Sequence, residues 1–189
     1  MLLALWLIVV GLVFLCVCLN RHVSRGISCE SQVPFFDDKR VGLIAVGDTF
    51  CMATTAGGDA LYAWGRADYG CSGLGKQAAK AYGGSYSSPV RVPIPHGVLI
   101  KQITAGSNCA MALTIDNELY TWGYEGTTGH GGYYLDNDCT VPLKLEVPGV
   151  KNVWAMDGGS QHGIMLVEMD QTKPADERET HPKKKKRRV

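Results

Sequence analysis

The sequence lacks the groupings of cysteine and histidine that metal sites, redox motifs and disulfide frameworks require. Its seven cysteines are an odd, scattered set, no Cys-x-x-Cys pair occurs, and the five histidines are dispersed. Structural zinc sites need these residues at short, regular spacings, and small disulfide-stabilised folds need an even number of cysteines. We therefore expect no metal site, no cofactor and no disulfide framework.

Long amphipathic helices are also missing, because no window of the body repeats its apolar residues with a period of 3.6. From residue 41 onward, short apolar segments are separated by glycine and proline, which is typical of strands joined by turns. The body is therefore expected to be all-β. We predict strands near residues 41–46, 50–55, 60–65 and 89–93, then near 99–105, 109–115, 118–123 and 141–147, with a third set beginning near 150–156 and 162–168.

Charged side chains are absent from residues 2–19, an apolar run that would span roughly 27 Å as a helix. No basic residue precedes the run and no clear cleavage site follows it, so we favour an uncleaved transmembrane anchor over a signal peptide. Arg21 and Arg25 follow directly, which predicts that the body faces the cytosol. The absence of an Asn-x-Ser/Thr acceptor agrees with that side. A wrongly placed start and a buried strand are the alternatives.

The last nine residues carry six basic side chains and nothing apolar enough to fold. These side chains are Lys183, Lys184, Lys185, Lys186, Arg187 and Arg188. The run resembles a monopartite nuclear import signal, and its charge would also attract nucleic acid or anionic lipid. A solvated tail is the simplest alternative. The anchor predicts a membrane location, while the tail favours the nucleus or the inner nuclear membrane.

The body contains an internal repeat. A Leu-Tyr-x-Trp-Gly stretch at Leu61, Tyr62, Trp64 and Gly65 returns 58 residues later at Leu119, Tyr120, Trp122 and Gly123. Upstream of each copy an apolar run ends in glycine, at Gly47 and Gly106, and a third such start has Gly159 followed by His162. A Gly-Leu-Gly triplet, Gly73-Leu74-Gly75, follows the first copy. A repeat at this period indicates a stacked architecture.

Alternation within a strand should place Leu61 and Ala63 on one face of a sheet and Tyr62 and Trp64 on the other. Turn-forming residues, Gly57-Gly58-Asp59 and Asn117, separate the apolar runs as in β-hairpins. Four short strands cannot cover both of their faces, so successive copies must stack. The pattern therefore predicts propeller blades.

These motifs resemble the regulator of chromosome condensation repeats over residues 41–168. The resemblance implies a seven-bladed β-propeller, of which this chain offers a partial one: two complete four-stranded repeats and the start of a third. A partial propeller cannot close, so it implies self-association, a covering partner or a truncated product. The best-known member of the family is an exchange factor for the GTPase Ran and binds chromatin.

Two candidate catalytic arrangements are weak. Residues 70–77 have the glycine and lysine spacing of a phosphate-binding loop, but Gln77 stands where a magnesium-binding hydroxyl is needed. Cys109 and His162 occupy equivalent slots of neighbouring repeats, yet nothing orients them as a pair. His162 is instead expected to bond to the backbone of an adjacent strand. No catalytic residue is predicted.

The sequence thus divides into an anchor (1–20), a polar linker (21–40), the repeats (41–168) and a basic tail (169–189). We interpret the chain as a membrane-anchored, non-catalytic protein-interaction module. Its partner is an unidentified protein, with a small GTPase among the candidates. The alternatives are a guanine-nucleotide exchange factor for a Ran-like GTPase and a non-functional fragment of a larger propeller.

Overall fold

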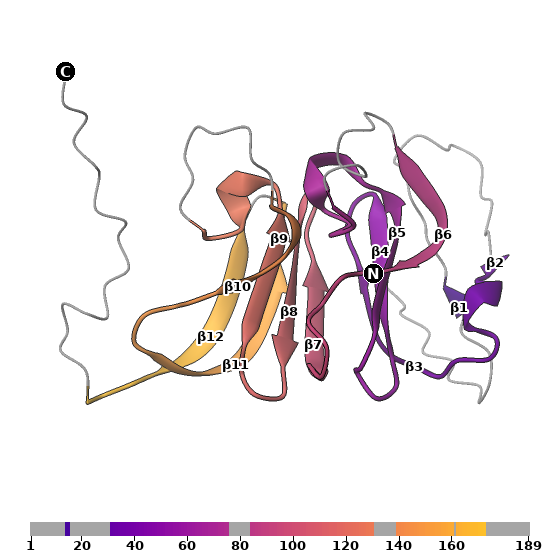
Figure 1. Ribbon diagram of the computed structural model, residues 1–189. Coiled ribbons are helices and arrows are strands. Elements are labelled where there is room, and N and C mark those ends of the chain that lie inside the picture. Colours follow the sequence, from indigo (N-terminus) through magenta and orange to yellow (C-terminus); the bar gives the residue numbers. More distant parts are fainter. Residues whose placement is uncertain (1–13, 16–30, 76–83, 131–138, 161, 173–189) are drawn as a thin grey trace, which may run out of the picture.

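The structure is a computed structural model that describes residues 14–15, 31–75, 84–130, 139–160 and 162–172. Three antiparallel sheets follow one another along the chain and stand side by side in the molecule (Figure 1). Their order in space is their order in the sequence, so each repeat forms its own sheet. The all-β prediction is confirmed.

Each of the first two sheets has four strands that pair in sequence order. The first contains β3 (Val41–Val46), β4 (Phe50–Thr55), β5 (Leu61–Arg66) and β6 (Ser85–Arg91). The second contains β7 (Ile100–Ala105), β8 (Cys109–Thr114), β9 (Leu119–Gly123) and β10 (Cys139–Leu145). The third has two strands, β11 (Val150–Gly158) and β12 (Gly163–Met169). The predicted strands are confirmed, with the fourth strand of each repeat beginning earlier than expected.

Proline explains the early starts. Pro89 lies inside β6 and Pro142 inside β10, and both strands are at the edge of their sheet. Proline cannot donate a ladder hydrogen bond, so it is tolerated at edges and bulges. The pairing register shifts near both prolines, between β5 and β6 and between β9 and β10. The predicted strands begin at Pro89 and one residue before Pro142, whereas the observed strands begin earlier and bulge past both prolines.

Two apolar cores fill the spaces between the sheets. The first joins sheets one and two, and its largest buried side chains include Phe50, Met52 and Trp122. The second joins sheets two and three, around Met111 and Leu113. Strand β8 contributes to both, because its alternate residues face opposite sheets. The middle sheet is therefore covered on both faces.

Short elements precede the first sheet: β1 (Phe14–Leu15), which pairs with β2 (Ser31–Gln32), and a 3₁₀ turn, η1 (Pro34–Phe36). Two more 3₁₀ turns, η2 (Asp68–Gly70) and η3 (Glu125–Thr127), follow β5 and β9. No helix in the described part of the chain is long and apolar enough to cross a membrane. Phe14–Leu15, the described part of the predicted helical anchor, form a strand instead of a helix because they pair with Ser31–Gln32. The rest of the predicted anchor lies outside the described residues, as does the basic run.

Candidate interaction surface

Trp122, the second copy of the repeated tryptophan, joins the second sheet to the first repeat. Trp122 is fully buried, and its indole Nε1–H donates a hydrogen bond of 3.0 Å to the backbone carbonyl of Cys71 in the preceding repeat. A Cβ atom on Gly73 would lie 2.8 Å from the same indole nitrogen. The glycine of the Gly-Leu-Gly triplet is thus needed so that the next repeat's tryptophan can approach, and Leu74 packs on the same core.

Trp64, the first copy of this tryptophan, has a different neighbour. It is half-buried and lies 5.9 Å from the ring of Phe36, measured between centroids. Tyr62 packs edge to face against Phe35 at 5.0 Å and Phe36 at 5.8 Å. The segment expected to be a polar linker therefore supplies two aromatic rings that cover the outer face of β5. The alternation predicted for β5 is confirmed, since Leu61 and Ala63 face the first core.

The repeated glycines lie where neighbouring sheets come closest. A Cβ atom on Gly47 would lie 2.3 Å from the carbonyl oxygen of Gly106, and one on Gly106 would lie 2.1 Å from that of Gly159. Real Cβ atoms do not approach backbone oxygen this closely, so any larger residue would force the sheets apart. This spatial series of glycines follows the repeat from sheet to sheet.

His162 does not make the contact expected of it. Its side chain is exposed, and within the described chain no hydrogen bond joins its ring to an adjacent strand. Phe50 and Cys109, which occupy the equivalent slots, are buried. His162 differs because no described sheet lies beyond the third one.

The comparison with known families agrees with this geometry. The regulator of chromosome condensation (RCC1) repeat matches residues 59–113, and a second description of the same repeat matches residues 100–127. These matches include both tryptophans and the glycines that follow them. The repeats belong to the RCC1 family.

Relatives of the RCC1 repeats differ widely in kind. The ultraviolet-B receptor UVR8 of Arabidopsis thaliana is 31% identical over 153 residues, covering 78% of this chain and 32% of the receptor. The guanine nucleotide exchange factor SRM1 of Saccharomyces cerevisiae is 31% identical over 162 residues, covering 79% and 33%. The structure of yeast RCC1 (Prp20) bound to Kap60 matches with a TM-score of 0.56 at 26% identity, covering 67% and 30%. This chain spans about a third of the length of each.

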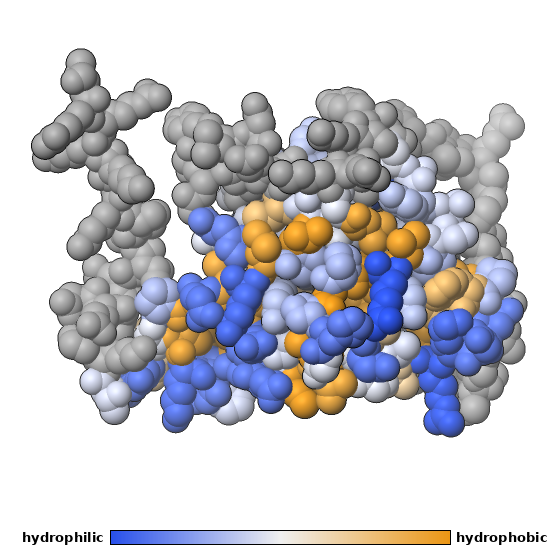
Figure 2. All heavy atoms as spheres, in the orientation of Figure 1, coloured by the Kyte–Doolittle hydropathy of each residue, from blue (hydrophilic) through white to orange (hydrophobic). Residues whose placement is uncertain are grey.

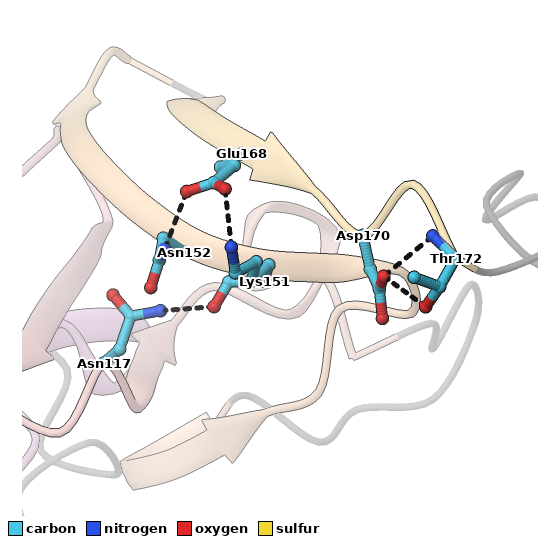
Figure 3. A network of polar contacts seen from close by, with 6 residues as sticks. All are labelled: Asn117, Lys151, Asn152, Glu168, Asp170 and Thr172. Atoms are coloured by element: carbon cyan, nitrogen blue, oxygen red, sulfur yellow. Dashed lines mark hydrogen bonds and ion pairs between the residues drawn. The ribbon is translucent and has the colours of Figure 1, made fainter.

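The turn between β4 and β5 and the turn between β8 and β9 form a second link between the RCC1 repeats. Gly58 and Asn117 both have left-handed backbone conformations, with φ of 72° and 67°. The carbonyl of Gly58 accepts a 2.9 Å hydrogen bond from the Ile100 amide at the start of the next sheet. At the following interface the side-chain oxygen of Asn117 accepts a 3.1 Å bond from the equivalent amide of Val153. The side-chain amide of Asn117 also donates to the carbonyl of Lys151 at 3.2 Å (Figure 3).

Asn117 was predicted only as a turn former, so its contact with the third sheet is a finding of the structure. The position of Asn117 in the repeat points to this contact, because Asn117 aligns with Gly58, whose turn contacts the next sheet. Asparagine tolerates the left-handed conformation and also carries a peptide-like amide. One residue thus shapes the turn and joins two sheets.

Two exposed tyrosines contact each other at the end of the sheets where turns η2 and η3 lie. Turns η2 and η3 lie at the same end of neighbouring sheets (Figure 1). Tyr69 in η2 and Tyr124 beside η3 are 41% and 42% exposed, and their rings meet edge to face at 5.8 Å. Tyr69 has φ of 56°, a left-handed conformation that costs a non-glycine residue on the order of 1 kcal/mol. The surrounding loops hold this tyrosine against Tyr124 despite that cost.

Polar contacts hold the loop beneath the pair. The guanidinium of Arg66 forms an ion pair with Asp68 at the start of η2. The amide of Gly75 donates a 2.8 Å hydrogen bond to the carbonyl of Thr140 in β10. The loop of the first repeat is therefore fixed to the edge strand of the second. Together Tyr69, Tyr124 and Arg66 form what we call the tyrosine surface.

The buried cysteines of the repeats are poorly suited to nucleophilic chemistry. Burial raises the pKa of the Cys51 and Cys109 thiols, and burial together with the nearby Asp68 carboxylate raises that of Cys71 to about 12. The reactive form of cysteine is the thiolate, so these groups are protonated near neutral pH. In the described ranges no three His, Cys, Asp or Glu residues are grouped as metal ligands would be.

The remaining motif residues belong to the cores and turns. Leu119 is buried in the second core. The hydroxyl of Tyr120, a buried residue of the first core, donates to Glu118 at 3.1 Å. Gly65, the next-to-last residue of β5, and Gly123, the last residue of β9, have φ of 101° and 113°, which a residue with a side chain rarely adopts. These positions build the fold and are separate from the tyrosine surface.

Proposed function

We propose that this chain is a non-catalytic protein-interaction module that binds its partner through the tyrosine surface. The observation that carries the proposal is the exposed pair of Tyr69 and Tyr124, held edge to face by two neighbouring repeats. Tyrosine offers a large, rigid contact area with a polar hydroxyl and few rotatable bonds. A residue kept in a costly backbone conformation is more typical of a functional loop than of a passive turn.

The relatives support a binding role over a specific chemistry. Proteins described as a receptor, an exchange factor and ubiquitin-protein ligases all match this chain over about two thirds or more of its length. A repeat shared by proteins of such different kinds acts as a scaffold. The function of each protein then depends on which residues its repeats expose.

Site-specific crosslinking tests the proposal. A photoreactive amino acid placed at position 124 should form covalent adducts with a discrete protein in cells that make the chain. The matched control is position 143, because Leu143 in β10 is similarly exposed at 43% but is outside the tyrosine surface. Equal adducts at both positions, or adducts at neither, would refute the proposed surface.

Exchange-factor activity is the second candidate, because SRM1, itself described as a guanine nucleotide exchange factor, matches 79% of this chain. The test is release of labelled GDP from a purified Ran-type GTPase. Acceleration by the chain would establish this second function. Binding of the GTPase without faster release would leave the interaction module as the better description.

We also infer from the sequence that residues 2–19 anchor the chain in a membrane with its body in the cytosol. The alternative is that the basic run directs the chain to the nucleus or the inner nuclear membrane. The support is the uncharged apolar run and the six clustered cations. Extraction of membranes with alkaline carbonate tests the anchor, since an anchored chain stays in the pellet. Replacing the six basic residues by glutamine should remove any enrichment at the nucleus.

A further inference from the structure

The third sheet has an apolar face that no described part of the chain covers. Trp154 in β11 and Ile164 and Leu166 in β12 are 64%, 67% and 65% exposed. No other large apolar side chains in the described chain are as exposed. Figure 2 shows hydrophobic atoms among polar ones at the left end of the stack, where this sheet lies.

The alternation of β12 defines which face this is. Met165 and Val167 pack against the core that joins sheets two and three. Ile164 and Leu166 alternate with them and therefore point away from the second sheet. By the repeat spacing, Ile164 corresponds to Met52 and Met111, both of which are buried under a following sheet. The outer face of the third sheet is thus built for contact with another sheet.

Glu168, which follows Ile164 and Leu166 at every second position of β12, has its charge paired on this face. Glu168 accepts hydrogen bonds from Lys151 at 2.9 Å and from Asn152 at 2.7 Å (Figure 3). Two copies of the face could therefore meet without bringing unpaired Glu168 carboxylates together.

The opposite end of the stack is partly closed already. Phe35 and Phe36 cover the outer face of β5, the place where an incoming sheet would have to lie. Ile44 and Val46 on the neighbouring β3 are left 54% and 49% exposed. One end therefore has an aromatic cover from its own chain, and the other has none among the residues that the structure describes.

We propose that the outer face of β11 and β12, centred on Trp154, Ile164 and Leu166, is a symmetric interface with a second copy of this chain. A face that meets itself across a two-fold axis gives a closed dimer, whereas stacking of the third sheet onto a first sheet would continue without end. The covered first sheet and the paired charge of Glu168 both favour the two-fold arrangement. This interface is independent of the tyrosine surface.

Crosslinking between differently tagged copies of the full chain tests the interface. A photoreactive amino acid at position 164 should give a product of twice the chain mass that contains both tags. The same amino acid at position 46, on the first sheet, should not. Leu166→Lys should abolish the product at position 164, while Val46→Lys should leave it unchanged. Both substituted side chains are exposed in the fold, so circular dichroism should be unaltered.

Each alternative occupant predicts a different result. Absence of a doubly tagged product at position 164 across a concentration series would overturn the proposal. So would products larger than a dimer that Val46→Lys and Leu166→Lys remove equally, because these would indicate stacking of third sheet on first. An adduct with a different protein at position 164 would also overturn it.

Discussion

At the scale of single residues, the two repeated tryptophans make different contacts although their motifs match. Trp122 enters the preceding repeat and is fully buried with its indole nitrogen bonded, while Trp64 is half-buried beside Phe36. The difference comes from what precedes each sheet. Trp122 faces another sheet, and Trp64 faces a short aromatic turn.

Replacing Trp122 by alanine should lower the free energy of unfolding by about 3–5 kcal/mol, because it removes a large buried side chain and leaves the Cys71 carbonyl without its donor. Urea denaturation measures this loss. The control is Trp154→Ala, which truncates an exposed tryptophan and should change stability by less than about 1 kcal/mol in dilute protein. Equal losses for the two variants would contradict the assigned burial.

At the scale of the element, the turn between β8 and β9 has two roles. It connects the two strands of a hairpin, and through Asn117 it joins the second sheet to the third. Asn117→Gly separates these roles, since glycine keeps the left-handed conformation but removes the side-chain amide. We expect a loss of about 1–3 kcal/mol from the unpartnered Val153 amide, and faster hydrogen exchange at that amide. If exchange at Val153 stayed slow in this variant, the Asn117 link would not be what protects it.

The hairpin of β11 and β12 should also weaken in acid. The Asn152 amide, and then the Lys151 ammonium, hold the pKa of Glu168 below its usual range. A lowered carboxyl pKa in the folded state stabilises the fold above the unfolded pKa, near 4.3, and this contribution is lost as pH falls through the folded value. Glu168 is partly exposed and solvent screens its charge, so the effect should be small.

The matched variant for this prediction is Glu168→Gln, which keeps the shape and an acceptor but has no charge to lose. Its stability deficit relative to the natural chain should be largest near about pH 7 and shrink toward about pH 3. Denaturant midpoints across that range measure it. A deficit that did not depend on pH would show that the Glu168 charge contributes nothing.

At the scale of the whole molecule, the stack has two unlike ends: Phe35 and Phe36 cover one, and no described part of the chain covers the other. Phe36→Ala should remove the cover of Tyr62 and Trp64 and lower stability by roughly 3 kcal/mol. It should also let first and third sheets stack, so light scattering should show assemblies that grow with concentration. Phe36→Leu keeps an apolar cover and should not produce them, and identical scattering of both variants would refute the capping role.

The strands, their repeat and the inward face of β5 could be predicted from the sequence, because alternation, turn residues and the Leu-Tyr-x-Trp-Gly spacing are local patterns. Only the tertiary structure revealed the Phe36 cover, the Asn117 link and the contact of Tyr69 with Tyr124. Each joins residues of different elements, and a side chain's partner there depends on how the sheets stack. The same limit explains the error at His162: its place in the motif was readable, whereas its exposure depended on whether another sheet covers it. The sequence by itself determined which sheets form, and the stacking of those sheets decided which faces are buried and which can bind.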